Sequence, residues 1–418
     1  MNDGTHAQIG KSDGWIVCGA VVFLTTLSLC GRIVELYLPY GDIALLTVIT
    51  LCLFWRRPNV DRPVVYGMLL TAILVAGLRS SETDLAFKWV LKLAALFAFA
   101  SSLVHRPQLC AAIFNGARIA VLLNGAAILL ALVGFTDLII PSGEGRAFTV
   151  LTYSGVLARI GASCLFYYIY VVLGASRISL ADVAGLLACT AIMMQDGSRT
   201  SMILAIPVPV FAVLCLVADR RTQRLWVLAL VLIIPMYEFR DMLVTIESGN
   251  PLYRVQQTIE KLCAGDFEDA DGARYQLAEH AMQLIRSAPV LGSGLGAARL
   301  GSDHQSGYQV VHNAYLQLWA ESGLLGLIAT ICLMWCWTGR ALQAYQCIRT
   351  IGDMRSRAFH YNMLFMLLYS GLSCMSQPFG TECSDWIIWL GSYAAIYSLP
   401  LRKQLLPSPS SGYGIREH

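Results

Sequence analysis

The sequence predicts an all-α, polytopic membrane protein with about twelve transmembrane helices and one large outer loop. Three observations support this fold class: the apolar composition, a succession of apolar runs of membrane-crossing length, and a polar stretch that interrupts them late in the chain. Of the 418 residues, 56% are hydrophobic and 14% are charged, and the mean hydropathy is +0.59. Soluble domains usually carry about 25% charged residues, so most of this chain is predicted to lie in lipid.

The apolar runs recur along most of the chain. A helix needs about 20 apolar residues to cross the hydrocarbon layer, within a range of about 17 to 25, and it satisfies its backbone N–H and C=O groups internally. Several runs are short, and the one at 181–195 is the weakest. The runs are 15–31, 34–55, 64–78, 85–104, 109–134, 155–175, 181–195, 201–218, 225–239, 312–338, 358–377 and 385–400.

Charge in the short loops orients the predicted bundle. Basic residues collect in alternate loops, and the loops between them are poorer in arginine and lysine. Because basic loops stay on the cytoplasmic side, both chain ends are predicted to be cytoplasmic, which agrees with an even number of crossings. The basic loops and the tail carry Arg56, Arg57, Arg62, Arg106, Arg177, Arg220, Arg221, Arg224, Arg340, Arg349, Arg355, Arg357, Arg402 and Lys403.

These features divide the chain into four parts. Residues 1–239 carry roughly the first nine predicted helices, and residues 240–311 form a large polar loop on the outer side. Residues 312–400 carry the remaining helices, and residues 401–418 form a cytoplasmic tail. Compact connections usually have about 4–6 residues, so a loop of this length suggests a functional role.

The large loop is predicted to contain an amphipathic helix near 272–287. Apolar side chains at positions i, i+4, i+7 and i+8 would share one face of that helix. The glycine-rich run GSGLG at 292–296 then predicts turns that lead back to the membrane. The apolar face of the helix carries Leu277, Ala281, Leu284 and Ile285.

Composition also excludes some classes of function. The net charge of +3 is small and dispersed, which does not suggest a nucleic-acid partner. Most of the 13 cysteines lie in apolar runs, where they act as small hydrophobic side chains, and no CxxC or Cys/His spacing indicates a metal site. Cys263 and Cys383 would face the same outer side, and whether they pair is left open because spacing does not fix connectivity.

His312 lies where the large loop meets the predicted helix at 312–338. An imidazole titrates near neutrality and can accept a proton from a hydroxyl group. The alternative is a histidine at a helix end, with Asn313 as the capping residue.

Arg199 lies in a short polar hinge, QDGSRT at 195–200, which the topology also places outside. An arginine near the membrane is costly and suggests an anionic partner. The alternatives are a side chain that reaches to lipid headgroups or one that pairs with Asp196.

Arg274 is predicted at the start of the loop helix. A helix N-terminus offers free backbone N–H groups, which favour phosphate, and the guanidinium adds a bidentate donor pair. The alternative is a solvated helix residue.

The topology gathers these three side chains on one side of the membrane. One base and two guanidiniums, without a metal cluster, suit transfer of a sugar from a lipid-linked diphosphate to a hydroxyl group. The guanidiniums would neutralise the diphosphate, so that no metal is needed.

Three motifs resemble those of bacterial O-antigen ligases. The superfamily also contains O-antigen polymerases and protein O-oligosaccharyltransferases. The first motif is His312-Asn313 followed by nine residues, Gly323, two residues and Gly326. The second is GSRT at 197–200, which opens an apolar helix, and the third is DGAR at 271–274 followed by APVLGSGLG at 288–296. The motifs span about residues 195–330.

The resemblance implies an inner-membrane glycosyltransferase of the GT-C-like class, without a cofactor, that acts in lipopolysaccharide biosynthesis. Such ligases take O-antigen from undecaprenyl pyrophosphate on the periplasmic face and pass it to lipid A–core, with inversion and without a metal. By this resemblance, His312 would activate the acceptor hydroxyl, and Arg199 and Arg274 would bind the diphosphate. The partners would be this donor, this acceptor and membrane lipids, and not nucleic acid.

Other functions stay open at this point. An O-antigen polymerase shares the same motifs. A twelve-helix transporter would usually show repeated halves and a binding site near the midplane, which this chain does not suggest, and a structural membrane subunit would depend on none of the three side chains. Gly323 and Gly326 are predicted to let a neighbouring helix pack closely.

Overall fold

The computed structural model describes most of the predicted helices. It covers residues 15–19, 21–22, 63–81, 83–103, 106–142, 146–152, 156–196, 207–219, 260, 267–300, 309–375 and 383–399. The predicted runs at 34–55 and 225–239, together with Arg199 and Cys263, lie outside the described residues.

The described chain is mostly helical, as the sequence predicts, and two short antiparallel two-stranded ladders were not predicted. The helices are α4 (Pro63–Leu78), α5 (Thr83–Leu103), α6 (Pro107–Leu132), α7 (Val156–Gly174), α8 (Leu180–Asp196), α10 (Pro207–Ala218), α13 (Phe267–Ser287), α14 (Ala314–Ile348), α15 (Met354–Ser373) and α16 (Cys383–Tyr397). The short helix η1 (Thr136–Leu138) precedes the ladder of β1 (Ile139–Ser142) and β2 (Arg146–Thr149), and the second ladder joins β3 (Arg299–Leu300) to β4 (Gln309–Val310).

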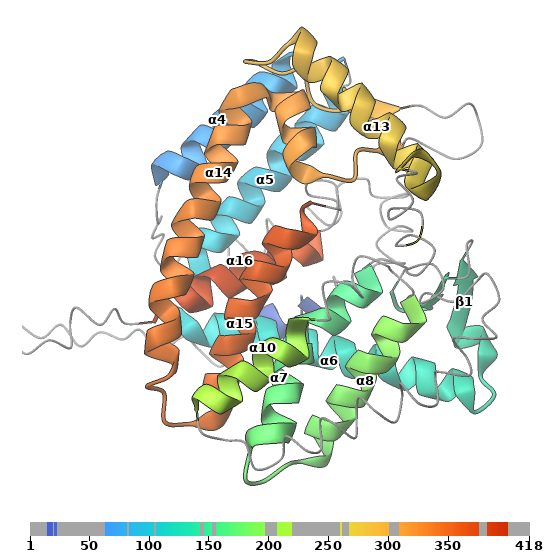
Figure 1. Cartoon of the computed structure of the whole chain (residues 1–418), viewed down its shortest axis with the longest axis vertical. Helices are drawn as coiled ribbons and strands as arrows, with labels where there is room; N and C mark the ends of the chain where they lie inside the picture. The colour runs from blue at the N-terminus through green and yellow to red at the C-terminus, as the bar shows by residue number, and fades with distance from the viewer. Residues whose placement is uncertain are drawn as a thin grey trace, which may run out of the picture.

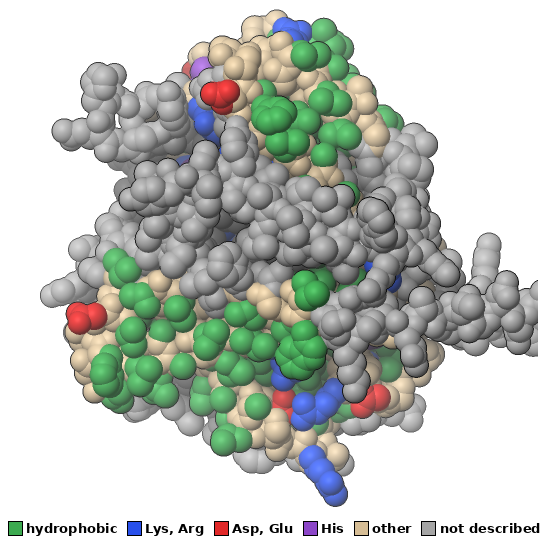
Figure 2. Space-filling model, turned by 180° about the vertical axis from the view of Figure 1, so that it is seen from behind, with side chains coloured by type: hydrophobic (Ala, Val, Ile, Leu, Met, Phe, Trp, Pro, Cys, Tyr) green, Lys and Arg blue, Asp and Glu red, His purple; other side chains and the backbone are tan. Residues whose placement is uncertain are grey.

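Three described helices are long and apolar enough to cross a membrane: Gln108–Leu132, Leu157–Gly174 and Ala314–Ile348. Shorter apolar helices lie on other predicted runs, among them the weak one at 181–195, where α8 forms. Many apolar side chains are exposed on the molecule, and Figure 2 shows such side chains spread over the lower half of one face. Apolar exposure on this scale is expected of a protein surrounded by lipid, so the chain is a multi-pass membrane protein.

The helices form two groups that meet around α15 and α16 (Figure 1). In one group α4, α5 and α14 run beside each other, and α13 lies across the end of α14 (Figure 1). In the other group α7 packs against α6, α8, α10 and α15. Aromatic side chains fill the centre of this second group: the rings of Phe166 and Phe365 stack with centroids 6.0 Å apart, and Tyr361 meets Tyr170 edge to face at 5.5 Å.

A buried amide joins α15 to α7. The backbone N–H of Tyr167 donates to Asn362 Oδ1 at 3.0 Å, and Asn362 Nδ2 donates to the carbonyl of Ser163 at 2.7 Å. Ser163 and Tyr167 are four residues apart, so Asn362 bridges a donor and an acceptor that bond to each other in a regular helix. Polar side chains commonly hold helices together in this way where the surroundings are apolar.

The end of α14 differs from the prediction. The run at 312–338 was expected to end before Arg340, which was assigned to a basic loop, but α14 continues to Ile348 and buries Arg340. The guanidinium donates to the carbonyls of Tyr397 at 2.6 Å and Leu399 at 2.5 Å, and it lies 5.1 Å from the Tyr397 ring. The carbonyls left open at the end of α16 thus accept hydrogen bonds from Arg340. The sequence had suggested instead that this guanidinium was solvated.

Candidate functional site

The backbone around His312 is fixed on both sides. Before it, β4 pairs with β3 so that Val310 lies opposite Arg299. After it, Asn313 is the N-cap of α14, because its Oδ1 accepts from the N–H groups of Tyr315 at 3.1 Å and Leu316 at 3.0 Å. The capping role of Asn313 is therefore confirmed. His312 itself is half-buried between these two anchors.

The first turn of α14 is also tied to the end of α15. The N–H of Ala314 donates to the carbonyl of Cys374 at 2.8 Å, and the hydroxyl of Tyr315 donates to the carbonyl of Gly371 at 2.8 Å. The last turn of α15 would otherwise leave such carbonyls open. His312 is therefore held at a junction of β4, α14 and α15.

Helix α14 is broken at Gly323, whose φ of 68° and ψ of −165° are not helical. The loop at 289–294 enters the break. In the loop, the N–H of Ser293 donates to the carbonyl of Ala320 at 2.8 Å, and the N–H of Gly294 donates to that of Glu321 at 3.0 Å. In the opposite direction, the N–H of Leu324 in the helix donates to the loop carbonyls of Pro289 at 3.0 Å and Val290 at 3.1 Å. The backbone groups that the break releases are thus satisfied by the loop, which makes the break tolerable inside a membrane protein.

Two glycines make this insertion possible. A Cβ on Gly323 would lie 2.2 Å from the carbonyl oxygen of Val290, and a Cβ on Gly292 would lie 2.3 Å from the carbonyl oxygen of Glu321. Both residues also have positive φ, which glycine adopts at little cost. The prediction that Gly323 serves helix packing is wrong, because it is the point where the loop crosses the helix. Gly326 does face a helix, with Ala72 of α4 3.7 Å from the position of a Cβ.

The loop is anchored on its other side by the end of α4. The N–H of Leu295 donates to the carbonyl of Ala76 at 3.1 Å, and the hydroxyl of Ser80 donates to the carbonyl of Leu295 at 2.7 Å. Gly294, with φ of 104°, passes so close to the backbone that a Cβ would lie 2.7 Å from the carbonyl oxygen of Arg79. The predicted turns at 292–296 are confirmed, and they form a wedge between α4 and α14.

Glu321 connects this wedge to α14 through its side chain. Its carboxylate is 5% exposed and accepts from Gln317 Nε2 at 3.2 Å and from the backbone N–H groups of Gly296 and Ala298, with the charge of Arg299 nearby. A buried carboxylate is tolerated when it is hydrogen-bonded and paired in this way. Sequence reasoning missed Glu321, although an acidic residue inside an apolar run is a signal that it has a specific partner.

The amphipathic helix of the large loop packs as predicted. Leu277, Ala281 and Ile285 of α13 are buried in one cluster with Val311 and Ala320, and Leu284 packs against the same cluster. This cluster places α13 on the first half of α14 and on the residue that precedes His312. The loop helix and the histidine therefore belong to one packed unit.

Arg274 does not begin that helix. Helix α13 starts at Phe267, so Arg274 lies seven residues inside it, and its own N–H is beyond the open N–H groups of the first turn. The reason given for a phosphate site at a helix N-terminus is therefore wrong for this residue. Arg274 is half-buried and lies one turn before Leu277, on the helix that packs beside Val311.

Of the three predicted site residues, the structure thus describes two. His312 and Arg274 lie on elements that share the cluster of Leu277 and Val311, and Arg199 lies outside the described residues. Within the residues described, no group of three histidine, cysteine or acidic side chains is arranged to hold a metal ion.

Comparison with known proteins assigns the region that contains this site. Residues 162–331 match the sequence model of a family described as O-antigen ligase. The matched segment runs from α7 through the break in α14, and it contains Arg199, Arg274 and His312. No curated protein matches the chain. The match over this segment supports a place for the chain in the superfamily of O-antigen ligases and polymerases.

Proposed function

We propose that the chain is an O-antigen ligase, which transfers O-antigen from undecaprenyl pyrophosphate to lipid A–core on the periplasmic face of the inner membrane. The single observation that carries the proposal is the setting of His312, a half-buried imidazole fixed between the large loop and α14 inside the segment that matches the family. That setting suits an amphiphilic substrate whose lipid stays in the bilayer and whose diphospho-sugar is presented at its edge.

In the proposed reaction, His312 accepts the proton of the acceptor hydroxyl as the hydroxyl oxygen attacks the anomeric carbon. The bond between that carbon and the diphosphate oxygen breaks, the configuration inverts, and undecaprenyl pyrophosphate leaves as an anion. Arg199 and Arg274 hold that anion, and their bidentate donors neutralise it without a metal ion. The packing of α13 beside Val311 supports a place for Arg274 near the histidine.

A break in a membrane helix is also a feature of transporters, where half-helix ends bind the solute. In this chain the groups at the break are bonded to the backbone of the loop at 289–294. They are occupied by the protein itself, so the break supports a rigid scaffold for His312 better than a transport site.

The test is transfer in vitro with purified protein, a glycan linked to undecaprenyl pyrophosphate, and lipopolysaccharide that lacks O-antigen. We expect glycan on the lipid A–core, full activity in EDTA, and loss of transfer in His312→Ala. Arg199→Lys and Arg274→Lys should retain little activity, because an ammonium group lacks the bidentate geometry.

Two controls separate the alternatives. Polymer that grows on the lipid-linked donor without any acceptor lipopolysaccharide would identify an O-antigen polymerase instead. Inhibition of the purified protein by EDTA, or wild-type transfer by His312→Ala, would refute the proposed mechanism.

A further inference from the structure

Helix α6, which is long and apolar enough to cross a membrane, carries an arginine well inside it. Arg118 lies eleven residues after the first residue of the helix, Pro107. Charged side chains are costly in such helices and are usually kept for a specific partner. The proposed glycan transfer gives this residue no role.

Aromatic rings surround the Arg118 guanidinium. Its Nε donates to the hydroxyl of Tyr168 at 3.2 Å, and its central carbon lies 5.0 Å from the ring centroid of Tyr167, 5.6 Å from that of Tyr168 and 5.9 Å from that of Phe114. These contacts hold the guanidinium plane in place. They use one of its three nitrogens as a hydrogen-bond donor.

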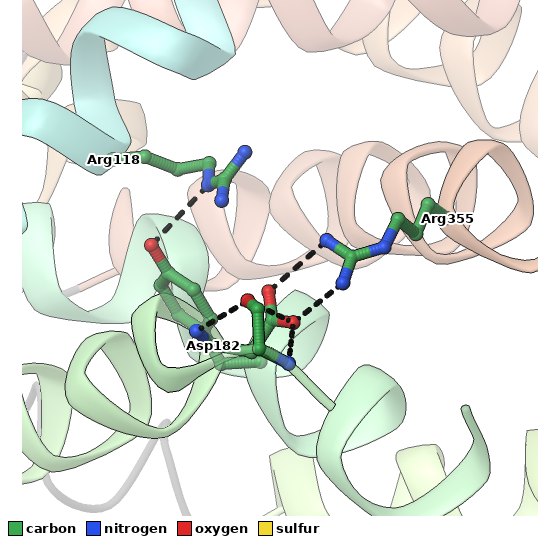
Figure 3. A network of polar contacts seen from close by, with 5 residues as sticks. Arg118, Asp182 and Arg355 are labelled. Atoms are coloured by element: carbon green, nitrogen blue, oxygen red, sulfur yellow. Dashed lines mark hydrogen bonds and ion pairs between the residues drawn. The ribbon is translucent and has the colours of Figure 1, made fainter. Parts of the chain in front are cut away.

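Figure 3 draws one dashed line from Arg118, which starts at Nε, and none from its two terminal nitrogens. In the part of the chain that the structure describes, no carboxylate pairs with them. The neighbouring Arg355 is different, because its terminal nitrogens donate to both oxygens of Asp182 at 3.2 and 2.6 Å (Figure 3). Arg118 therefore presents a bidentate donor pair to an anion that comes from outside this network.

A cavity of about 500 Å³ opens beside Arg118, between α6 and the helical residues 15–19. Its wall combines three polar side chains, Arg118, Asn115 and Gln108, with apolar ones that include Trp15, Ile119 and Leu122. A volume of several hundred Å³ with a few converging polar groups is typical of ligand sites. The mixture fits a molecule with one anionic end and an apolar chain.

One end of the cavity fits the headgroup level of a bilayer, because Gln108 is in the first turn of α6. Tyr168 precedes the end of α7, at Gly174, by six residues, which corresponds to about 9 Å along the helix. The Tyr167 ring faces Arg118, and Arg355, which pairs with Asp182, is in the first turn of α15. Arg118 itself lies about 16 Å along α6 from Pro107, and its side chain reaches Tyr168 near the end of α7. The loop charges of the sequence predict that these ends of α6, α7 and α15 are cytoplasmic.

We propose that this cavity binds an anionic glycerophospholipid. The terminal nitrogens of Arg118 bind the phosphate, Asn115 and Gln108 face the polar headgroup, and an acyl chain lies along Ile119 and Leu122. An anionic lipid is favoured over a zwitterionic one because a headgroup ammonium would bring a second positive charge to a guanidinium that has no carboxylate partner among the described residues.

The test uses native mass spectrometry of the full-length protein in detergent, titrated with phosphatidylglycerol or with phosphatidylcholine. The wild type should retain phosphatidylglycerol in preference to phosphatidylcholine. Arg118→Leu should lose that preference, and Arg118→Lys should bind at least about tenfold more weakly, which corresponds to one lost charge-assisted hydrogen bond. Arg349→Leu is the matched control, because it removes the same charge from the same predicted side of the membrane, where Arg349 donates to the carbonyl of Ala218.

Two further arms keep the test decisive. Brominated phosphatidylglycerol should quench tryptophan fluorescence in the wild type, and Trp15→Phe should remove a distinct part of that quenching. Inorganic phosphate should not displace the lipid. Three results would each overturn the proposal: equal lipid retention by Arg118→Lys and the wild type, no preference of the wild type for phosphatidylglycerol, or displacement of the lipid by free phosphate. If Arg118→Leu does not fold, the comparison of Arg118→Lys with the wild type tests the proposal.

Discussion

The crossing of the glycine loop and α14 makes Gly323→Ala an informative substitution. An alanine at φ 68° and ψ −165° occupies a region that is essentially restricted to glycine, and its Cβ would lie 2.2 Å from the carbonyl oxygen of Val290 and 2.5 Å from the nitrogen of Gly292. Because both contacting atoms belong to backbone, neither can move aside by a change of rotamer.

The cost follows from the strain and from the bonds that the crossing makes. The backbone strain is worth about 1–3 kcal/mol. If the loop withdraws, the bonds from Ser293, Gly294 and Leu324 are lost as well, at about 1 kcal/mol each. Because withdrawal of the loop relieves the strain, we expect a cost of about 3 kcal/mol against the native crossing, from the three lost bonds. A shift of about 1 Å in a reacting group can lower a rate about 100-fold, so a large loss of transfer should accompany a lower melting temperature.

The assay pairs thermal unfolding in detergent with glycan transfer in vitro. Gly339→Ala is the control, because Gly339 lies in the same helix and a Cβ there meets nothing within 4 Å. That variant should be neutral or slightly stabilised, since alanine is the better helix former. Wild-type melting and wild-type transfer in Gly323→Ala would show that the loop does not cross the helix as described.

The other predictions concern three buried polar contacts. Glu321→Gln should lower transfer at least about tenfold, because an amide can satisfy fewer of the backbone donors at 296 and 298; unchanged turnover would mean that the wedge holds without the charge. Asn362→Leu should lower the free energy of unfolding by about 2–3 kcal/mol, because the buried N–H of Tyr167 and the buried carbonyl of Ser163 lose the amide as a partner. A melting temperature equal to that of the wild type would contradict this bridge. Asp182→Asn should cost about 1–2 kcal/mol, a value reduced because the Arg355 side chain is 44% exposed; stability independent of this change would show that solvent replaces the pair.

Several features of the fold were predictable because they depend on local pattern. The described α-helices other than α13 overlap the predicted apolar runs, and the buried face of α13 follows from a spacing of apolar residues that repeats with the helical turn. The cap at Asn313 and the turns at 292–296 follow from side-chain and backbone preferences that act over a few residues.

Helix boundaries were less predictable. The loop helix was predicted near 272–287, but α13 begins at Phe267 and passes through Gly272. A glycine inside a helix costs about 1 kcal/mol, and burial of a few apolar side chains on α14 exceeds that cost. Arg340 shows the same effect, because carbonyls from α16, more than fifty residues away in sequence, convert an expected loop residue into a buried one.

By itself, the sequence determined the membrane class of the chain, the amphipathic loop helix, and the His312-Asn313 motif that indicates the family. Tertiary structure alone decided that α14 breaks at Gly323, that the loop fills the break, and that Glu321 secures it. The physical reason is the range of the interactions. Helix periodicity and capping are settled within one or two turns, whereas a break in a membrane helix is stable only when a distant segment supplies hydrogen bonds to the backbone groups that it leaves open.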